Sequence, residues 1–322
     1  MGNPFISLLD SKVEMTSHQE RREELVFAAR FSVYSNTVLV LLKLIVGLAM
    51  SSIAVISEAI HSGTDLVAAL IANFSVRKST KLADEDHKFG HGKYESFSGT
   101  IEAALIFVAA IIIIYEAALK LMEDAPVRII EAGIVVMAIS ATLNFAVSRY
   151  LLKVAKKHES LALEADGLHL KTDVWTSVGV FFGLVIVRIT NIQAIDPIFG
   201  MIVAVIIIGV SVRLTRRSAL ELLDHSLTQD EEKVILTTIT EVTGELASFH
   251  GLRTRRSGHE RFVDFHLVVP KHLEVETAHR ICDDIEKKVV DKLPNSNITI
   301  HIEPCSEECE GCKNAPICKG AH

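Results

Sequence analysis

Two short segments of the chain each carry a histidine and an aspartate four residues apart. The first pair is His61 and Asp65, and the second is His169 and Asp173, in the run His-Leu-Lys-Thr-Asp. On a helix, residues four apart lie on the same face. Two imidazoles and two carboxylates form a ligand set that suits tetrahedral Zn²⁺. The alternative is that each pair is a local hydrogen bond that only joins helices, although the repetition of the pair favours a metal site.

Both pairs lie in or beside long apolar stretches. Hydrophobic residues make up 49% of the 322-residue chain, and its mean hydropathy is +0.34. A bilayer core about 30 Å thick requires roughly 20 helical residues to cross it. Six segments approach that length with few charges: Phe31–Ser51, Ile53–Ser75, Ile101–Leu121, Ile129–Val147, Val174–Thr190 and Ile195–Val212. Six such segments favour an integral membrane protein over a soluble protein with buried helices.

After Arg217 the composition becomes that of a small soluble domain. Residue periodicity predicts, in order, helix Asp230–Val242, strands Gly251–Arg256 and Arg261–Val269, helix Glu274–Leu293 and strand Asn297–Glu303. The predicted fold class is an α-helical membrane protein with six transmembrane helices and a C-terminal cytoplasmic α+β domain (αββαβ, metallochaperone-like). We expect an N-terminal segment 1–30, a membrane domain 31–217, a metal-binding domain 218–304 and a cysteine-rich tail 305–322.

Charge is distributed unevenly along the chain. The formal net charge of −7 and the 6% aromatic content argue against a nucleic-acid partner. Basic residues concentrate before the first span, between spans two and three, between spans four and five, and after span six, whereas the opposite side has only Lys120, Arg128 and Arg188. The positive-inside rule therefore predicts that both termini are cytoplasmic. The first 30 residues show no secretory signal peptide pattern.

Several motifs occur in a fixed order across the six predicted spans. They are Ser57–Asp65, Phe89–Glu95 and Ala165–Asp173, together with Asn36, Lys43 and the pair Asp196-Pro197. With these motifs, the chain from about Arg30 to Glu303 resembles the cation diffusion facilitators, a family of proton-coupled divalent-cation exporters. The resemblance implies that His61, Asp65, His169 and Asp173 form a transport site near the membrane midplane, and that the fifth helix begins before its apolar window.

The ligand types at this site favour zinc as the cargo. Imidazole suits Zn²⁺ better than the harder Mn²⁺ or Mg²⁺, and the set with two His-Asp pairs resembles the zinc-selective branch of the family. Fe²⁺, Co²⁺, Ni²⁺ and Cd²⁺ remain alternatives. Because metal binding requires neutral imidazoles and ionised carboxylates, metal and protons compete for the same atoms. His169 is the first candidate for proton coupling, and His61 is the second.

Two further groups of candidate ligands lie outside the predicted spans. Asp84, His87 and His91 follow a D-x2-H-x3-H spacing, which matches a peripheral metal site in the family, although a solvated polar loop is the alternative. The resemblance also implies a binuclear zinc site at a dimer interface of the soluble domain. Its ligands would be His250, His266, His279, His301 and Glu303. Glu303 stands where bacterial members commonly have aspartate, which leaves its ligation open.

The resemblance implies a homodimer in which Lys93 and Asp224 pair as a charge interlock between the membrane and soluble parts. A solvated ion pair worth under about 1 kcal/mol is the alternative. The loop before the second motif carries a single histidine, His158, rather than a long His-rich stretch. This favours a bacterial or archaeal cytoplasmic membrane over a vesicular one.

All five cysteines lie near the C-terminal end: Cys282, Cys305, Cys309, Cys312 and Cys318. The last four have the spacing C-x3-C-x2-C-x5-C, and clustered thiols in a reducing compartment indicate metal or redox chemistry rather than structural disulfides. A thiolate zinc site, an iron–sulfur cluster and thiols without a ligand all remain open.

Together these features predict a secondary active transporter rather than an enzyme. It would export Zn²⁺ from the cytoplasm across the inner (cytoplasmic) membrane in exchange for protons, by alternating access in a homodimer. The rival within transport is the same mechanism with Fe²⁺, Co²⁺ or Cd²⁺ as the main substrate. The rival from another class is a membrane-anchored metal sensor that does not transport, for which intramembrane His and Asp ligands would be unnecessary.

Overall fold

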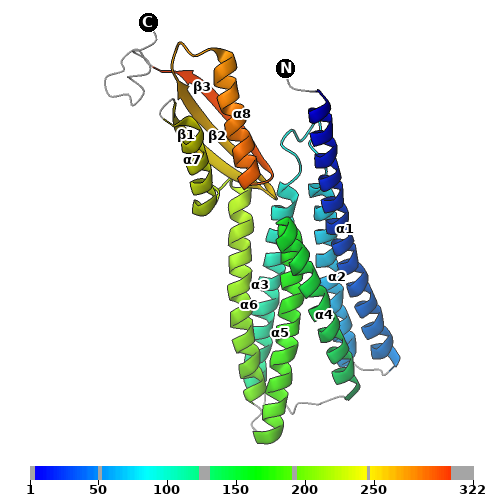
Figure 1. Cartoon of the computed structure of the whole chain (residues 1–322). Helices are drawn as coiled ribbons and strands as arrows, with labels where there is room; N and C mark the ends of the chain where they lie inside the picture. Colours follow the sequence, from blue (N-terminus) through cyan, green and yellow to red (C-terminus); the bar gives the residue numbers. More distant parts are fainter. Residues whose placement is uncertain (1–3, 50–52, 123–130, 191–193, 245–246, 306–322) are drawn as a thin grey trace. The chain divides into compact units, whose positions relative to one another are not determined.

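The computed structural model of the chain describes residues 4–49, 53–122, 131–190, 194–244 and 247–305. The chain divides into two compact units, Met1–Ala219 and Leu220–His322. Six long helices build the first unit, the last of them ending just inside the second (Figure 1). They are α1 (Pro4–Ala49), α2 (Ile53–Ser79), α3 (Lys93–Met122), α4 (Glu131–His158), α5 (Leu161–Thr190) and α6 (Ile195–Leu222).

Four of these helices are long and apolar enough to cross a membrane, judged over the described residues. The candidate spans are His18–Ala49, Ala59–Ser79, Lys93–Leu119 and Pro197–Leu222. They correspond to the first, second, third and sixth of the six predicted spans. The other two, predicted at 129–147 and 174–190, fall on α4 and α5 and include residues outside the described set. The first unit is therefore a helical domain of membrane type, with four candidate spans rather than six.

The helix α5 begins earlier than its apolar stretch, as the family resemblance implied. Ser160 precedes the first turn, and its hydroxyl accepts a hydrogen bond from the Leu163 backbone N–H at 3.4 Å. A serine at this position satisfies one of the backbone donors that every helix start leaves free. Because the helix starts at Leu161, both His169 and Asp173 lie well inside it. Their four-residue spacing therefore places them on one face of a helix.

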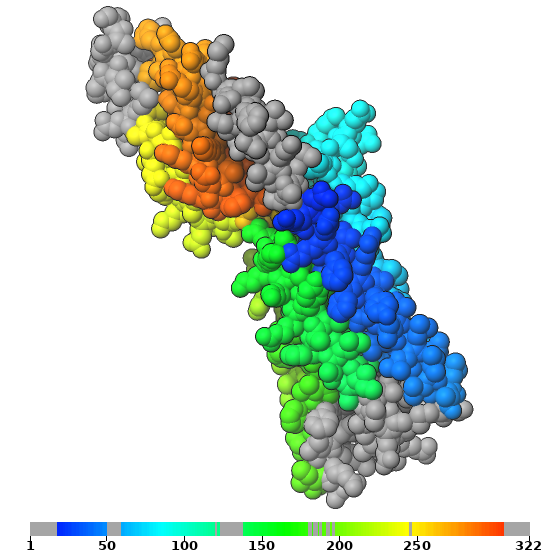
Figure 2. All heavy atoms as spheres, turned by 45° about the vertical axis from the view of Figure 1, so that its right-hand side comes forward, coloured from blue at the N-terminus to red at the C-terminus, as the bar shows by residue number. Residues whose placement is uncertain are grey.

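A glycine contact fixes α5 against α4. A Cβ at Gly167 would lie 2.9 Å from Cγ of Leu152, so the two helices approach more closely there than a side chain would allow. At the same place the Ser148 hydroxyl donates a hydrogen bond to the Gly167 carbonyl at 2.7 Å. The helix α4 also packs against α1, and the space-filling view shows the blue N-terminal helix beside the green segment (Figure 2). The position of α5 is thus set by its fit to α4.

Replacing Gly167 by alanine is expected to destabilise the first unit. The new methyl group would overlap the Leu152 side chain, and overpacking of this kind costs about 1–3 kcal/mol. The matched control is Gly209→Ala in α6, where an added Cβ meets nothing within 4 Å. Thermal unfolding of the purified protein should show a lower midpoint for Gly167→Ala and an unchanged or higher midpoint for Gly209→Ala. Equal midpoints for the two variants would contradict the close packing of α4 and α5.

The second unit is a small sheet with two helices. Its elements are α7 (Gln229–Thr243), β1 (Ser248–Ser257), β2 (Glu260–Val269), α8 (Val275–Lys292) and β3 (Ser296–Pro304). The sheet order is β1-β2-β3, with an antiparallel first pair and a parallel second pair. Val263, Phe265 and Leu267 of β2 pack with Ile235 and Ile239 of α7 and with the apolar face of α8. The predicted αββαβ order is observed, and the helices cover one face of the sheet.

A partly buried carboxylate connects α7 to the strands. Thr228 and Glu231 form a capping box at the start of α7, in which each side chain binds the other residue's backbone N–H. Glu231 also accepts a hydrogen bond from Arg261 Nε at 2.8 Å and contacts the Arg256 guanidinium. Burial opposes ionisation of this carboxyl, but the hydrogen bonds from Arg261 and Thr228 and the charge of Arg256 lower the pKa of Glu231 to about 2.

The stabilisation from Glu231 is expected to depend on pH. Because its pKa is depressed in the folded protein, the contribution is full above the unfolded value of about 4.3 and is lost as the pH falls toward 2. Glu231→Gln should therefore speed hydrogen exchange in α7 and β2 near neutral pH, and this difference from wild type should shrink in acid. Glu276→Gln, on the exposed first turn of α8, is the control and should leave exchange in α7 unchanged. A Glu231→Gln effect of the same size at every pH would contradict this assignment.

Candidate metal centres

The four ligands predicted within the membrane helices lie together between α2 and α5. Nε2 of His169 is 3.1 Å from Oδ1 of Asp65, and Nε2 of His61 is 3.9 Å from Oδ1 of Asp173. Each histidine therefore contacts the aspartate of the other helix rather than the one four residues away in its own. These contacts between helices differ from the local His-Asp pairs considered as the alternative. Instead, the two helices share one cluster of four side chains.

Three of the four side chains have the spacing that a small cation requires. One ligand atom each from His61, Asp65 and Asp173 lies within 4.8 Å of the others. Metal–ligand bonds of about 2.0–2.1 Å around tetrahedral Zn²⁺ place neighbouring ligand atoms roughly 3.3 Å apart, so a modest contraction would be sufficient. Asp65 and His169 are buried, whereas half of the His61 side chain is exposed. The cluster is thus closed on one side and accessible at His61.

Polar atoms of this cluster remain available to a ligand. Within the described part of the chain, the buried atoms Nδ1 of His169 and Oδ2 of Asp173 have no hydrogen-bond partner. The neighbouring hydroxyls do not fill this role, because Thr176 and Ser177 both donate to the Asp173 backbone carbonyl, at 2.9 and 2.8 Å. An unpaired buried polar atom is costly. The donor set and its open valences fit a divalent cation or protons.

A buried lysine of α1 lies beside this cluster. Lys43 is 5% exposed and donates a hydrogen bond from Nζ to the hydroxyl of Ser62, the neighbour of His61, at 2.8 Å. The sequence showed Lys43 as a charge inside an apolar segment but gave no contact for it. The contact shows that α1 brings the Lys43 amino group close to the part of α2 that carries the candidate ligands.

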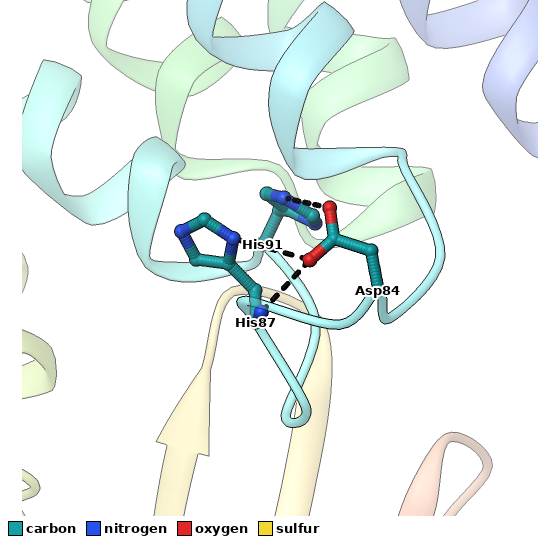
Figure 3. A group of neighbouring side chains, drawn as sticks. All are labelled: Asp84, His87 and His91. Carbon is teal, nitrogen blue, oxygen red and sulfur yellow. Dashed lines mark hydrogen bonds and ion pairs between the residues drawn. The ribbon is translucent and has the colours of Figure 1, made fainter.

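The predicted loop site is also assembled, between α2 and α3 (Figure 3). The carboxylate of Asp84 is 3.2 Å from Nδ1 of His87 and 3.3 Å from Nε2 of His91. The imidazole centroids are 4.4 Å apart. A hydrogen bond from the His87 backbone N–H, at 2.8 Å, lowers the pKa of Asp84 and holds its carboxylate between the two rings. Three ligand atoms of two chemical types therefore converge on one point of this loop.

In the second unit, three histidines form a row across the sheet. His250 of β1 lies opposite His266 of β2, which in turn lies opposite His301 of β3. Side chains alternate along a strand, so His266 faces away from the helix-covered side that holds Phe265 and Leu267. The pairing register of β1 shifts after His250, where Gly251 adopts a φ of +64°. A Cβ at Gly251 would lie 3.3 Å from the His266 ring, so the glycine makes room for the row.

Glu303 completes this row. Its carboxylate lies 2.7 Å from Nδ1 of His266, 3.6 Å from Nε2 of His250 and 3.8 Å from Nε2 of His301. The hydrogen bond with His266 lowers the pKa of Glu303. The longer side chain of Glu303 thus reaches the histidines. The sequence alone left open whether Glu303 could take part in this site. One ligand atom each from His250, His266 and Glu303 falls within a 4.8 Å group.

The remaining predicted ligands are not gathered in the described residues. His279 lies on α8, next to the core residue Ala278, and its Nδ1 is 3.7 Å from Asp283. Lys93 begins α3 in the first unit and Asp224 follows α6 in the second, where it contacts Arg255 at 3.4 Å. The interlock of Lys93 with Asp224 therefore stays a prediction.

The cysteine cluster lies largely outside the described residues. Cys309, Cys312 and Cys318 belong to the part of the chain that is not described, whereas Cys305 is buried at the end of the sheet. The Cys305 backbone N–H donates to the Val269 carbonyl at 2.9 Å. Burial raises the pKa of the Cys282 thiol to about 11, which disfavours the thiolate that a metal requires. The tail site stays a prediction.

Helices of membrane type that gather imidazole and carboxylate groups define a class: a helical membrane protein with buried ionisable ligands. The family model of the cation efflux transmembrane domain matches residues 29–223, and that of the cytoplasmic domain of cation efflux proteins matches residues 227–305. The chain therefore belongs to the cation diffusion facilitator family of membrane-embedded cation efflux transporters.

Several proteins resemble the chain over most of its length. An uncharacterized transporter of Synechocystis sp. is 33% identical over 80% of this chain and 83% of its own. The cation-efflux pump FieF of Serratia proteamaculans is 29% identical over 85% of this chain and 91% of its own, and FieF of Klebsiella pneumoniae is 30% identical over 83% and 89%. Solved structures of CzrB, including a zinc form, are 38% identical over 25% and 26% of this chain and 99% and 97% of theirs, with TM-scores of 0.24 and 0.25. Scores this low carry no structural argument.

Removing a histidine from the row on the sheet is expected to lower zinc binding by the full chain. His266→Ala removes the ring that lies between His250 and His301 and contacts Glu303, and loss of one ligand from a small site weakens binding strongly. Titration against a zinc-chelating dye should show fewer tightly bound ions per chain than in wild type. His272→Ala is the control, because His272 is exposed and belongs to none of the three clusters. If His266→Ala binds as many zinc ions per chain as wild type, the row is not a metal site.

Proposed function

We propose that the protein exports Zn²⁺ from the cytoplasm in exchange for protons. The observation that carries the proposal is the cluster of His61, Asp65, His169 and Asp173, in which side chains of α2 and α5 meet inside a helical bundle. Charged groups in such an environment need a partner or a function. Membership of a cation efflux family supports transport, and the two imidazoles support zinc over the harder divalent ions.

Exchange follows from the chemistry of the ligands. The four side chains bind a metal only when both imidazoles are neutral and both carboxylates are ionised. When the same atoms are protonated, their lone pairs bind protons and can no longer bind the metal. His169 is the main proton carrier in this proposal because its Nε2 already faces Asp65 while its Nδ1 is buried and open. His61, which is half exposed, is the second carrier.

A transport cycle can be written from this competition. Zn²⁺ reaches the cluster from the cytoplasm and displaces protons. The helices then rock so that the cluster opens to the other side, where protons displace the metal, and the protonated cluster returns. Six transmembrane helices, cytoplasmic termini and a location in the cytoplasmic membrane complete the proposal, together with domains 1–30, 31–217, 218–304 and 305–322. The excess of basic residues on one side supports this orientation.

The other clusters have regulatory or structural roles in this proposal. The row of His250, His266 and His301 with Glu303 binds zinc in the cytoplasmic domain, and the protein acts as a homodimer. Since His279 lies on the helix-covered side of its own sheet, it could complete the row only from a second copy, which would couple zinc to dimer closure. The Asp84 group on the loop binds metal at the membrane surface. Lys93 and Asp224 serve as an interlock, and the four tail cysteines as a further site.

The proposal is tested by metal uptake into proteoliposomes with an imposed pH gradient. Wild type should drive Zn²⁺ flux, and Asp173→Ala should abolish it, because the variant removes one of the four ligands. Zn²⁺, Cd²⁺, Fe²⁺, Co²⁺ and Mn²⁺ are compared to rank the substrates, with zinc expected first. Asp291→Ala removes an exposed carboxylate of α8 and should transport like wild type.

Two results would change the proposal. A higher flux of Fe²⁺, Co²⁺ or Cd²⁺ than of Zn²⁺ would keep the exchange mechanism and replace the substrate. Absence of flux for every metal, in a preparation whose soluble domain binds zinc, would overturn transport and favour a membrane-anchored sensor.

A further inference from the structure

Two buried carboxyl groups of the membrane-type unit belong to none of the metal clusters. Glu102 of α3 is 0% exposed, and Asp166 of α5 is 1% exposed. Within the described residues, neither oxygen of Glu102 has a hydrogen-bond partner, and the Asp166 carboxylate has the nearby Ser32 hydroxyl as its donor. The sequence placed Glu102 inside an apolar segment and Asp166 in a family motif, but it gave neither a role. Glu102 differs from Glu95, another buried acidic residue of α3, whose Oε1 accepts a hydrogen bond from the Ser79 hydroxyl at 2.8 Å.

The surroundings of Glu102 are apolar or neutral apart from Asp166. Its neighbours Ala103 and Ile106 pack against Ala165 of α5 and Ala204 and Ile207 of α6. The α6 hydroxyls on this side are Ser211, which donates to the Ala103 carbonyl at 2.8 Å, and Ser218, which lies opposite Gly99. Among ionisable groups, Asp166 is the one whose charge affects the ionisation of Glu102. The charge of Asp65 in turn affects the ionisation of Asp166. Asp65 lies on α2, which also packs against α3.

Such a pair cannot be fully ionised. An unpaired carboxylate in a medium of low polarity is strongly disfavoured, and two neighbouring carboxylates repel each other as well. Among the described residues, Glu102 has neither a cation nor a donor in hydrogen-bonding contact, and the Ser32 hydroxyl is the donor beside Asp166. In this conformation the pair therefore holds at least one proton, and its titration belongs to the pair rather than to one residue.

The pair lies close to the transport cluster along α5. Asp166 precedes His169 by three residues, and residues three apart on a helix have Cβ atoms about 5–6 Å apart. The charge of His169 acts on Asp166, as do those of Asp65 and Asp173. A divalent cation among these ligands would add positive charge within reach of the pair, and positive charge favours the ionised form of a carboxyl group.

We propose that Glu102 and Asp166 form a proton-holding carboxyl pair that releases a proton when a divalent cation binds at the neighbouring four-residue cluster. The inference deepens the proposed exchange and rests on it, because it adds a proton site that does not ligate the metal. The step moves a proton from a carboxyl oxygen to solvent, leaves a carboxylate behind and breaks no other bond. When protons return to the pair, its negative charge no longer compensates the positive charge of the metal, and metal binding weakens. The pair therefore strengthens the competition between cargo and protons.

The test counts the protons released per zinc ion bound by the full-length protein. Zn²⁺ is added to detergent-purified protein in weakly buffered solution near neutral pH, with a pH indicator and a zinc indicator read together. Glu102→Gln keeps the shape of the neutral carboxyl but cannot release a proton. It should bind as many zinc ions as wild type and release fewer protons, by roughly one for each chain whose transport cluster is filled. Glu102→Asp should restore the release.

The matched control is Glu116→Gln, which alters an exposed glutamate of the same helix and should release as many protons as wild type. Equal release by Glu102→Gln and wild type would overturn the inference. If Glu102→Gln does not purify as folded protein, Asp166→Asn decides in its place, with reduced release expected and unchanged release contradicting the pair. Failure of the proposed function is recognised separately, as the absence of gradient-driven zinc flux in wild type.

Discussion

The burial of ionisable side chains among apolar helices is the constraint on which the rest of the structure depends. Such groups are stable only when a cation, a proton or a hydrogen-bond donor compensates them. Asp65 and His169 compensate each other in part, while buried atoms of His169 and Asp173 remain open. The open positions make the cluster a place where cations and protons exchange. A cluster in which every polar atom is hydrogen-bonded would be more stable, but it would have no open position at which a cation or a proton could bind.

The helices position this cluster with ordinary packing devices. Ser160 starts α5 early enough for its two ligands to share one face, and the lack of a side chain at Gly167 lets α5 lie close to α4. On α1, Lys43 reaches Ser62 beside the ligands of α2. The soluble unit uses a different solution, in which the register of three strands aligns three histidines and a bulge at Gly251 clears the space beside them. Asp65 and His169 of the first cluster are buried, whereas no member of the second cluster is, so water competes for the ligands more in the second.

Much of this arrangement could be predicted from the sequence. The four-residue spacing of the His-Asp pairs indicated one helical face each, and the strand pattern around His266 and His301 predicted the αββαβ order that the structure contains. The exchange of partners between α2 and α5 could not be predicted, because spacing along a helix says nothing of which helix lies opposite. The pairing of Glu102 with Asp166 depends on the same tertiary information. The row of histidines required the strand register, which was set in part by the bulge.

The central claim is that the cluster accepts either the metal or protons but not both, and that this competition drives transport. Its most direct test measures zinc and proton movements together in one set of proteoliposomes that carry equal zinc inside and outside and a pH gradient. The account predicts that zinc accumulates on the acidic side, that protons move the opposite way in a fixed ratio, and that reversing the gradient reverses both fluxes. Zinc that only equilibrates, or that moves without any counterflow of protons, would contradict it.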